Sequence, residues 1–456
     1  MVKRVPKKVL PVFAKVWSDL LGEAVRSGSV SAWKGFLVFP RAILLSPPRG
    51  GRRISQKTSL ADLIQSRLEA WPARAEELWQ EVLSRSGRRE VRQAPAKEPT
   101  DVSRSKALEM SVVRALRLGD VQKALRVLCS AEMAPKGAST LSSLKALHPP
   151  GPLPLAVPPS VAPRFSADTV KTALSSFGPG SAAGLFGYTP FLLQQCLRAE
   201  SFHFSRALTD VVNLLADGRA PLFLQPFLAG GVSIALAKPN QGVRPLCCGD
   251  PLRRLVAKCF CMAGKDEISA VFKGRNYGVG CPGGVEVVAH SLRDVLQRHA
   301  QSDLALLKID FKNAFNLVDR QSFMSTTCST LPALSNWTNW CYSSPSILLY
   351  NHSDVFSSSS GVQQGDPLGP LYFCFGLSSL VEEISRLCPV YQKWYMDDGG
   401  IVAPVDVLLK VWDILRSTST LPSASGLGST RPPPLLAPSP PSPSSLLPRS
   451  ACSACP

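Results

Sequence analysis

Hydrophobic and polar positions along this chain follow two periods, which predict different elements. Residues 59–83 carry apolar side chains at helical spacing, with Pro72 as a break, and residues 252–260 also indicate a helix. Residues 166–177 predict a helix capped by Ser166. We therefore expect a basic, mainly helical region with linkers over residues 1–150. A proline-rich spacer, residues 149–163, marks a domain boundary.

Short apolar runs bounded by turn residues predict strands in the second half of the chain. Two such runs flank a Pro-Asn-Gln-Gly turn within residues 231–245 and predict a hairpin. Residues 304–309 predict a buried strand that ends on Asp310, and a helix is expected to start near Asp319. Residues 390–403, VYQKWYMDDGGIVA, predict a strand, a tight turn and a strand, with Asp397 and Asp398 at the exposed tip.

The placement of these acids has a chemical consequence. Adjacent carboxylates repel each other, and the pKa of each rises if both are desolvated. A divalent cation is the usual compensation, and hard oxygen ligands suit Mg²⁺ or Mn²⁺. Taken alone, Asp397 and Asp398 would also fit a solvated turn, because Asp and Gly are ordinary turn residues. Asp310 favours metal binding, since an acid at the end of an apolar strand is costly unless it binds something.

A third stretch completes the pattern. Residues 361–373, GVQQGDPLGPLYF, predict a glycine-rich turn and then a helix that carries Leu371, Phe375 and Leu380 inward. Asp310, Gln-Gly-Asp-Pro-Leu and Tyr-Met-Asp-Asp, in this order, resemble motifs A, B and C of reverse transcriptases. The flanking sequence resembles the polymerase of a non-LTR (LINE-like) retrotransposon. The resemblance covers residues 165–416.

This resemblance implies a fold. The expected class is α+β (mixed α/β), with the fingers and palm of a right-hand polymerase over residues 160–416 and an antiparallel palm sheet backed by helices. Residues 417–456 are rich in Ser and Pro, and this composition cannot build a thumb. We therefore expect a disordered tail, an absent thumb and a chain truncated after motif C.

The resemblance also implies a function, that of an RNA-directed DNA polymerase acting on an RNA template, a DNA primer and dNTPs. In such enzymes two Mg²⁺ ions, roughly 4 Å apart, activate the attacking oxygen and stabilise the leaving group. Asp310 and Asp397 would hold the metal, with Asp398 as the supporting acid.

Five residues match nucleotide-binding positions of the family. Arg244 and Lys238 would hold the triphosphate, for which a planar guanidinium is well suited. Phe315 would crowd the 2′-position of the sugar and so favour DNA synthesis, whereas without the resemblance it would be a core aromatic residue. Gln364 and Gly365 would lie near the nucleotide and the template base.

Five further residues are expected along the primer and template. The cations on the helix after the predicted fingers hairpin would contact phosphates; they are Arg253, Arg254 and Lys258. Tyr395 and Met396 would pack by the primer end. Residues 275–284 form a glycine-rich loop whose spacing fits neither a P-loop nor a dinucleotide fingerprint. We expect this loop to lie near the template strand.

Composition indicates the expected partner and cellular location of the protein. The net charge of +18 over 456 residues favours a polyanionic partner, with nucleic acid as the default. The 13 cysteines show no disulfide framework, which predicts an intracellular protein of the nucleus or cytoplasm. No apolar run approaches the ~20 residues of a membrane helix, so no membrane partner is expected.

Two alternatives stay open. One is a non-enzymatic nucleic-acid-binding remnant of a retrotransposon, although such a remnant would be expected to lose its acids. The other is an RNA-dependent RNA polymerase, which uses the same palm; its usual box is Gly-Asp-Asp, and the aromatic ring of Phe315 argues against it.

Overall fold

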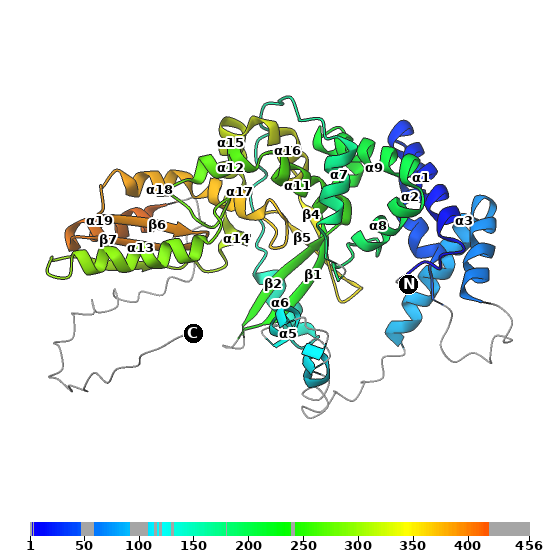
Figure 1. Cartoon of the computed structure of the whole chain (residues 1–456), viewed down its shortest axis with the longest axis horizontal. Coiled ribbons are helices and arrows are strands. Elements are labelled where there is room, and N and C mark those ends of the chain that lie inside the picture. Colours follow the sequence, from blue (N-terminus) through cyan, green and yellow to red (C-terminus); the bar gives the residue numbers. More distant parts are fainter. Residues whose placement is uncertain are drawn as a thin grey trace, which may run out of the picture.

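A computed structural model gives the architecture of the chain (Figure 1). It describes residues 2, 4–46, 59–91, 108–113, 116–117, 121–128, 132–178, 180–238 and 242–418. The predicted tail beyond residue 418 and the tip of the first predicted hairpin, residues 239–241, lie outside this description.

Three helices form the N-terminal end of the molecule: α1 (Leu10–Ser27), α2 (Val30–Ile43) and α3 (Leu60–Val91). A break was predicted at Pro72, and the helical geometry of α3 is interrupted close to it, at Arg74. Aromatic side chains hold the group together: Trp17 stacks on Phe36 and donates its indole N–H to the Phe36 carbonyl.

The chain then forms a series of short helices. They are α5 (Val121–Leu128), α6 (Ala138–Ala146), α7 (Ala167–Ser175), α8 (Pro190–Ala199), α9 (Ser201–Ala216), η1 (Leu222–Leu224) and α10 (Gln225–Leu228). The predicted cap of α7 is confirmed, since the Ser166 side chain accepts from the Thr169 amide. Helix α1 packs on α8 and α9. One hydrophobic core therefore joins the N-terminal helices to the rest of the chain.

The proline-rich spacer is held against the second half of the chain. The Gly151 amide donates to Ser359 Oγ at 3.1 Å, and the Leu155 amide donates to Gln321 Oε1 at 2.6 Å. Further along, Asn336 both donates to and accepts from the backbone of Ser160. The spacer is therefore an extended strap bonded to distant elements.

A four-stranded sheet occupies the centre of the molecule. Its strands are β1 (Gly231–Ala237), β2 (Val243–Gly249), β4 (Ser346–Tyr350) and β5 (Asp354–Ser358), in the order β2-β1-β4-β5. The β1–β2 hairpin confirms the prediction for residues 231–245, whereas β4 and β5 were not predicted. The pairing of β1 with β4 is parallel, and the other two pairings are antiparallel.

A three-stranded antiparallel sheet lies at the far end from α1–α3 (Figure 1). It consists of β3 (Ala305–Ile309), β6 (Tyr391–Tyr395) and β7 (Asp398–Ala403), in the order β3-β7-β6. Strand β3 is an edge strand and is less buried than predicted, since Leu306 is 42% exposed.

The remaining helices connect or cover the two sheets. They are α11 (Pro251–Ala263), α12 (Lys265–Phe272), α13 (Gly284–Arg298), α14 (Ala314–Leu317), α15 (Arg320–Thr330), η2 (Pro332–Leu334), α16 (Ser335–Tyr342), α17 (Gly369–Gly376), α18 (Ser378–Ser385) and α19 (Val405–Ser417). Asp319 caps α15 as predicted. Tyr391 donates to the Val288 carbonyl of α13, and its neighbour Gln392 donates to the Val381 carbonyl of α18. Because successive strand residues point to opposite faces, α13 and α18 cover opposite faces of β6.

The structure thus confirms a mixed α/β fold with antiparallel pairing and a helical N-terminal region. Among the described residues, no helix is long and apolar enough to cross a membrane.

Candidate active site

The three predicted acids come together at one end of the three-stranded sheet. Strand β3 pairs with β7 in a register that sets Ile309 opposite Gly399. Asp310 follows Ile309 directly and Asp398 precedes Gly399, so the same register carries these two acids to neighbouring positions. Asp397 lies in the turn between β6 and β7, as predicted.

The three carboxylates at this turn lie close together and differ in how far they are buried. Asp310 and Asp398 are exposed, whereas Asp397 is partly buried. Burial raises the pKa of Asp397, and the negative charges of Asp398 and Asp310 raise it further, while the Arg244 guanidinium opposes this shift. The three carboxylates and Arg244 therefore act on one another electrostatically, although they come from three separate segments.

The acids do not form a closed ligand set in this arrangement. Within the part of the chain that the structure describes, no group of three or more His, Cys, Asp or Glu side chains is arranged to hold a metal ion. The donor chemistry nevertheless fits a hard divalent cation, because the candidate atoms are carboxylate oxygens whose mutual repulsion a cation would relieve. After burial, this repulsion also contributes to the raised pKa of Asp397.

The glycine-rich loop predicted to lie near the nucleotide packs against the central hairpin. The Cys247 amide of β2 donates to the Gln364 carbonyl at 2.7 Å. Gly365 has a φ of 116°, and a Cβ atom there would lie 2.4 Å from the Cys247 carbonyl oxygen. Only glycine fits this position without displacing the strand. Gln364 is partly buried, whereas Lys238 and Arg244, on the same hairpin, are exposed.

Arg253 does not lie on a nucleic-acid surface, and the prediction for it is wrong. Its side chain is 1% exposed and forms a 2.7 Å ion pair with Asp366. It also donates to Tyr342 Oη, to Gln363 Oε1 and to the Ala229 carbonyl. Burial acts to lower the pKa of Arg253, but the Asp366 carboxylate together with Tyr342 and two neighbouring cysteines raises it overall. An arginine enclosed in this way stabilises the loop that carries Gln364 and cannot reach a phosphate.

Arg254 and Lys258 differ from Arg253 because they face the segment between α7 and α8. Arg254 donates to the Ala182 carbonyl, and Lys258 Nζ donates to Ser176 Oγ at 2.9 Å. Both cations also lie over the Phe177 ring. Neither has a carboxylate within ion-pair range among the described residues.

Phe315 lies on α14 and contacts the start of the glycine-rich loop. Its ring stacks on buried Phe373, with centroids 4.7 Å apart and planes at 12°. Its carbonyl accepts from the Val362 amide at 2.7 Å. Phe315 is partly buried, whereas the Phe373 ring on which it stacks is buried.

Sequence reasoning missed the residue that contacts the turn before the acids. Tyr395 and Met396 lie at the end of β6, as expected, and both are partly buried. The side chain of Asn276 bonds to both the amide and the carbonyl of Met396. Asn276 belongs to the loop placed near the template, and its neighbouring glycines were the only signal in the sequence.

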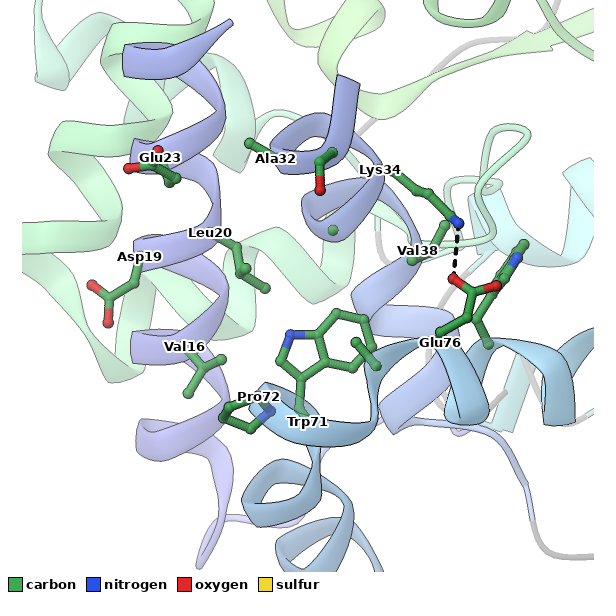
Figure 2. Close-up of a pocket in the computed structure, with 14 residues that line it drawn as sticks. Val16, Asp19, Leu20, Glu23, Ala32, Lys34, Val38, Trp71, Pro72 and Glu76 are labelled. Atoms are coloured by element: carbon green, nitrogen blue, oxygen red, sulfur yellow. Dashed lines mark hydrogen bonds and ion pairs between the residues drawn. The ribbon is translucent and has the colours of Figure 1, made fainter. Parts of the chain in front are cut away.

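A pocket elsewhere in the molecule does not belong to this site. It encloses about 610 Å³ between α1, α2 and α3, with Trp71 and Leu20 among its apolar residues. Figure 2 shows the ion pair between Lys34 and Glu76, 2.9 Å long, at its margin. These helices lie at the opposite end of the molecule from β6 and β7 (Figure 1).

Comparison with known proteins shows which family model and which protein the chain is similar to. Residues 236–418 match the family model described as reverse transcriptase (RNA-dependent DNA polymerase). The chain is also similar to the retrotransposable element SLACS 132 kDa protein of Trypanosoma brucei gambiense, with 25% identity over 270 residues. The alignment covers 56% of this chain and 21% of the relative, so the chain spans about a fifth of that protein's length.

Proposed function

We propose that this chain, whose residues 236–418 are a reverse transcriptase domain of retrotransposon type, adds dNTPs to the 3′-hydroxyl of a DNA primer on an RNA template. In the terms used for such polymerases, the central hairpin corresponds to the fingers and the three-stranded sheet to the palm. The observation that carries the proposal is the meeting of Asp310 with Asp397 and Asp398 at the end of one sheet.

Asp310 and Asp397 would hold the divalent metal ions, Mg²⁺ or Mn²⁺, and Asp398 would support them. When bound, such ions activate the attacking hydroxyl and neutralise charge on the leaving group. The β3–β7 pairing positions the acids, because the pairing of Ile309 with Gly399 fixes the backbone next to Asp310 and Asp398.

The other side chains of the site would bind and orient the substrates. Arg244 interacts with the charge of Asp397 and is exposed, so it can bind a triphosphate that reaches the acids. Lys238 would add a second cation on the same hairpin. Gln364 and Gly365 would contact the nucleotide and template base from the loop held by Cys247.

Phe315 would select the sugar. One side of its ring is fixed by Phe373, so the ring cannot retreat from an added 2′-hydroxyl. Arg254 and Lys258 would contact template or primer phosphates, and Tyr395 and Met396 would pack by the primer end.

Primer extension on an RNA template with Mg²⁺ and dNTPs tests this proposal. Replacing Asp397 and Asp398 together by Ala should reduce extension by about 10³-fold or more. Asp303→Asn is the matched control, because Asp303 is an exposed acid near the opposite end of β3.

The two alternatives are separate outcomes of the same assay. Extension with rNTPs as efficient as with dNTPs would indicate an RNA polymerase. Retained nucleic-acid binding without any extension by the wild-type chain would indicate a non-enzymatic remnant and would contradict the proposed activity.

A further inference from the structure

Met396 has a backbone conformation that its residue type disfavours. It lies between Tyr395, the last residue of β6, and Asp397, and its φ is 53°. Residues with a Cβ atom rarely adopt this left-handed region, and a long side chain gives no local hydrogen bond to offset its cost. The direction in which Asp397 leaves the sheet depends on this residue, so something outside the turn must hold it.

The segment before α13 supplies that contact. The Tyr277 amide donates to the Trp394 carbonyl at 2.8 Å, and the Trp394 amide donates to the Arg275 carbonyl at 3.2 Å. Asn276 thereby forms an isolated parallel bridge with Trp394. These bonds attach the segment to the outer edge of β6 and carry the Asn276 side chain to the turn.

The Asn276 carboxamide pairs with both backbone groups of Met396. Its Oδ1 accepts from the Met396 amide at 3.1 Å, and its Nδ2 donates to the Met396 carbonyl at 3.2 Å. The same Oδ1 accepts from the Gly278 amide at 2.9 Å, which fixes the orientation of the side chain. Asn276 is 5% exposed, so water competes little for these bonds.

Gly278 completes the contact by leaving room for the turn. A Cβ atom at this position would lie 2.7 Å from the Met396 nitrogen and 2.5 Å from its Cγ. The Asn276 carboxamide therefore bonds to Met396 in its left-handed conformation, and the absence of a side chain at Gly278 leaves space for it.

We propose that Asn276, with Gly278, is a positioning residue that holds Met396 in its left-handed conformation and thereby sets the placement of Asp397 and Asp398 for metal binding. The inference rests on the proposed function for the role of these acids. Asn276 itself touches neither substrate nor metal. Its role resembles that of outer residues at metal sites, whose replacement typically weakens metal affinity by about 10–100-fold.

Two readouts test the proposal without requiring catalysis. Amide hydrogen exchange in a peptide covering residues 395–400 reports on the turn, and Mn²⁺ binding followed by electron paramagnetic resonance reports on the acids. Asn276→Ala should speed exchange in that peptide and weaken Mn²⁺ binding by about 10-fold. Asn351→Ala is the control, because Asn351 is a left-handed asparagine in the β4–β5 turn of the other sheet.

A second substitution separates positioning from a general loss of structure. Glycine adopts the left-handed region without cost, so Met396→Gly in the Asn276→Ala background should recover part of the Mn²⁺ affinity. Gly278→Ala should reproduce the defect while leaving the Asn276 side chain in place.

The outcomes distinguish this proposal from the proposed function. If the wild-type chain does not extend a primer, but Asn276→Ala still speeds exchange and weakens Mn²⁺ binding, the polymerase activity fails and the positioning role stands. If Asn276→Ala leaves exchange over residues 395–400 unchanged, or changes it without changing Mn²⁺ binding, the positioning role is overturned.

Discussion

Asp366 and Asp397 differ in the charges that surround their carboxylates. Asp366 is buried, with an ion pair to Arg253 at 2.7 Å and a hydrogen bond from the Leu368 amide at 3.0 Å. Asp397 lies beside two further acids, and its pKa is raised by burial and by their charges. The fold pairs the first carboxylate with a cation, whereas the second lies beside like charges.

The comparison separates residues that build the site from residues that act in it. The side chains that bond to Asp366 stabilise the loop that contains Gln364 and Gly365. Tyr342 lies between two buried arginines there: the guanidiniums of Arg253 and Arg320 lie 5.3 and 5.2 Å from its ring centroid. Changes at Asp366 should therefore lower stability, whereas changes at Asp397 should lower activity and not stability.

The largest expected effect concerns the buried pair. Arg253→Met leaves the Asp366 carboxylate buried without a cation and should cost about 3–5 kcal/mol of unfolding free energy. Urea unfolding measures the loss. The double variant Arg253→Met with Asp366→Leu removes both charges and should recover much of it. A single variant within about 1 kcal/mol of wild type would show that the pair is not the anchor inferred here.

Asp250 is an intermediate case, buried without a cationic ion-pair partner among the described residues. It accepts from Tyr188 Oη and the Leu252 amide, but its Oδ2 has no partner, and burial raises its pKa to about 6. The folded state therefore holds this proton more tightly than the unfolded state. This group's stabilising contribution is complete below pH ~4 and is lost as the pH rises through ~6.

Asp250→Asn should remove that dependence. The difference in unfolding free energy between wild type and variant should change by up to about 2–3 kcal/mol between pH 4 and 7, in favour of the variant at pH 7. Denaturant unfolding at several pH values measures it. A difference that stays constant with pH would contradict the raised pKa.

Phe315 is the residue proposed to select the sugar, so its replacement should affect selectivity. Phe315→Ala should reduce discrimination against rNTPs by about 10–100-fold, because the ring no longer occupies the space beside the sugar. Competition between dNTP and rNTP in primer extension measures the ratio. Phe373→Leu removes the ring that supports Phe315 from its buried side, so it should lower stability and also reduce the same discrimination, by a smaller factor than Phe315→Ala.

The smallest effect is expected at Asp397 in the absence of metal. Asp397→Asn removes the repulsion with Asp310 and Asp398, and should raise the unfolding free energy by about 0.5 kcal/mol. Thermal unfolding in a chelator at pH 7 measures it. A variant less stable than wild type would show that the Asp397 carboxylate is satisfied by the fold, as that of Asp366 is.

Local signals in the sequence predicted the elements that place the acids. The strand ending at Asp310, the hairpin turn at Asp397 and the caps at Ser166 and Asp319 depend on neighbouring residues, and the structure has all of them. The resemblance implied an antiparallel palm sheet, but no local pattern specifies that β3 pairs with β7, because the two strands are distant in the sequence.

Two features could not be predicted because they depend on tertiary contacts. Arg253 has the sequence context of an exposed helix cation, and only the approach of Asp366 and Tyr342 shows that it is buried. In the sequence Asn276 has the features of an ordinary loop residue, and only the pairing of its loop with β6 shows its contact with Met396. In both cases a polar side chain bonds to a segment about 110 to 120 positions away.

The central claim is that the acids of two distant segments form one metal site, and metal-directed cleavage tests it most directly. Fe²⁺ bound in place of Mg²⁺, with ascorbate and peroxide, generates radicals that cut the backbone nearby. The account predicts cuts near both Asp310 and Asp397, which excess Mg²⁺ suppresses and Asp397→Asn abolishes. Cleavage near only one of these acids, or cleavage that Mg²⁺ does not suppress, would contradict it.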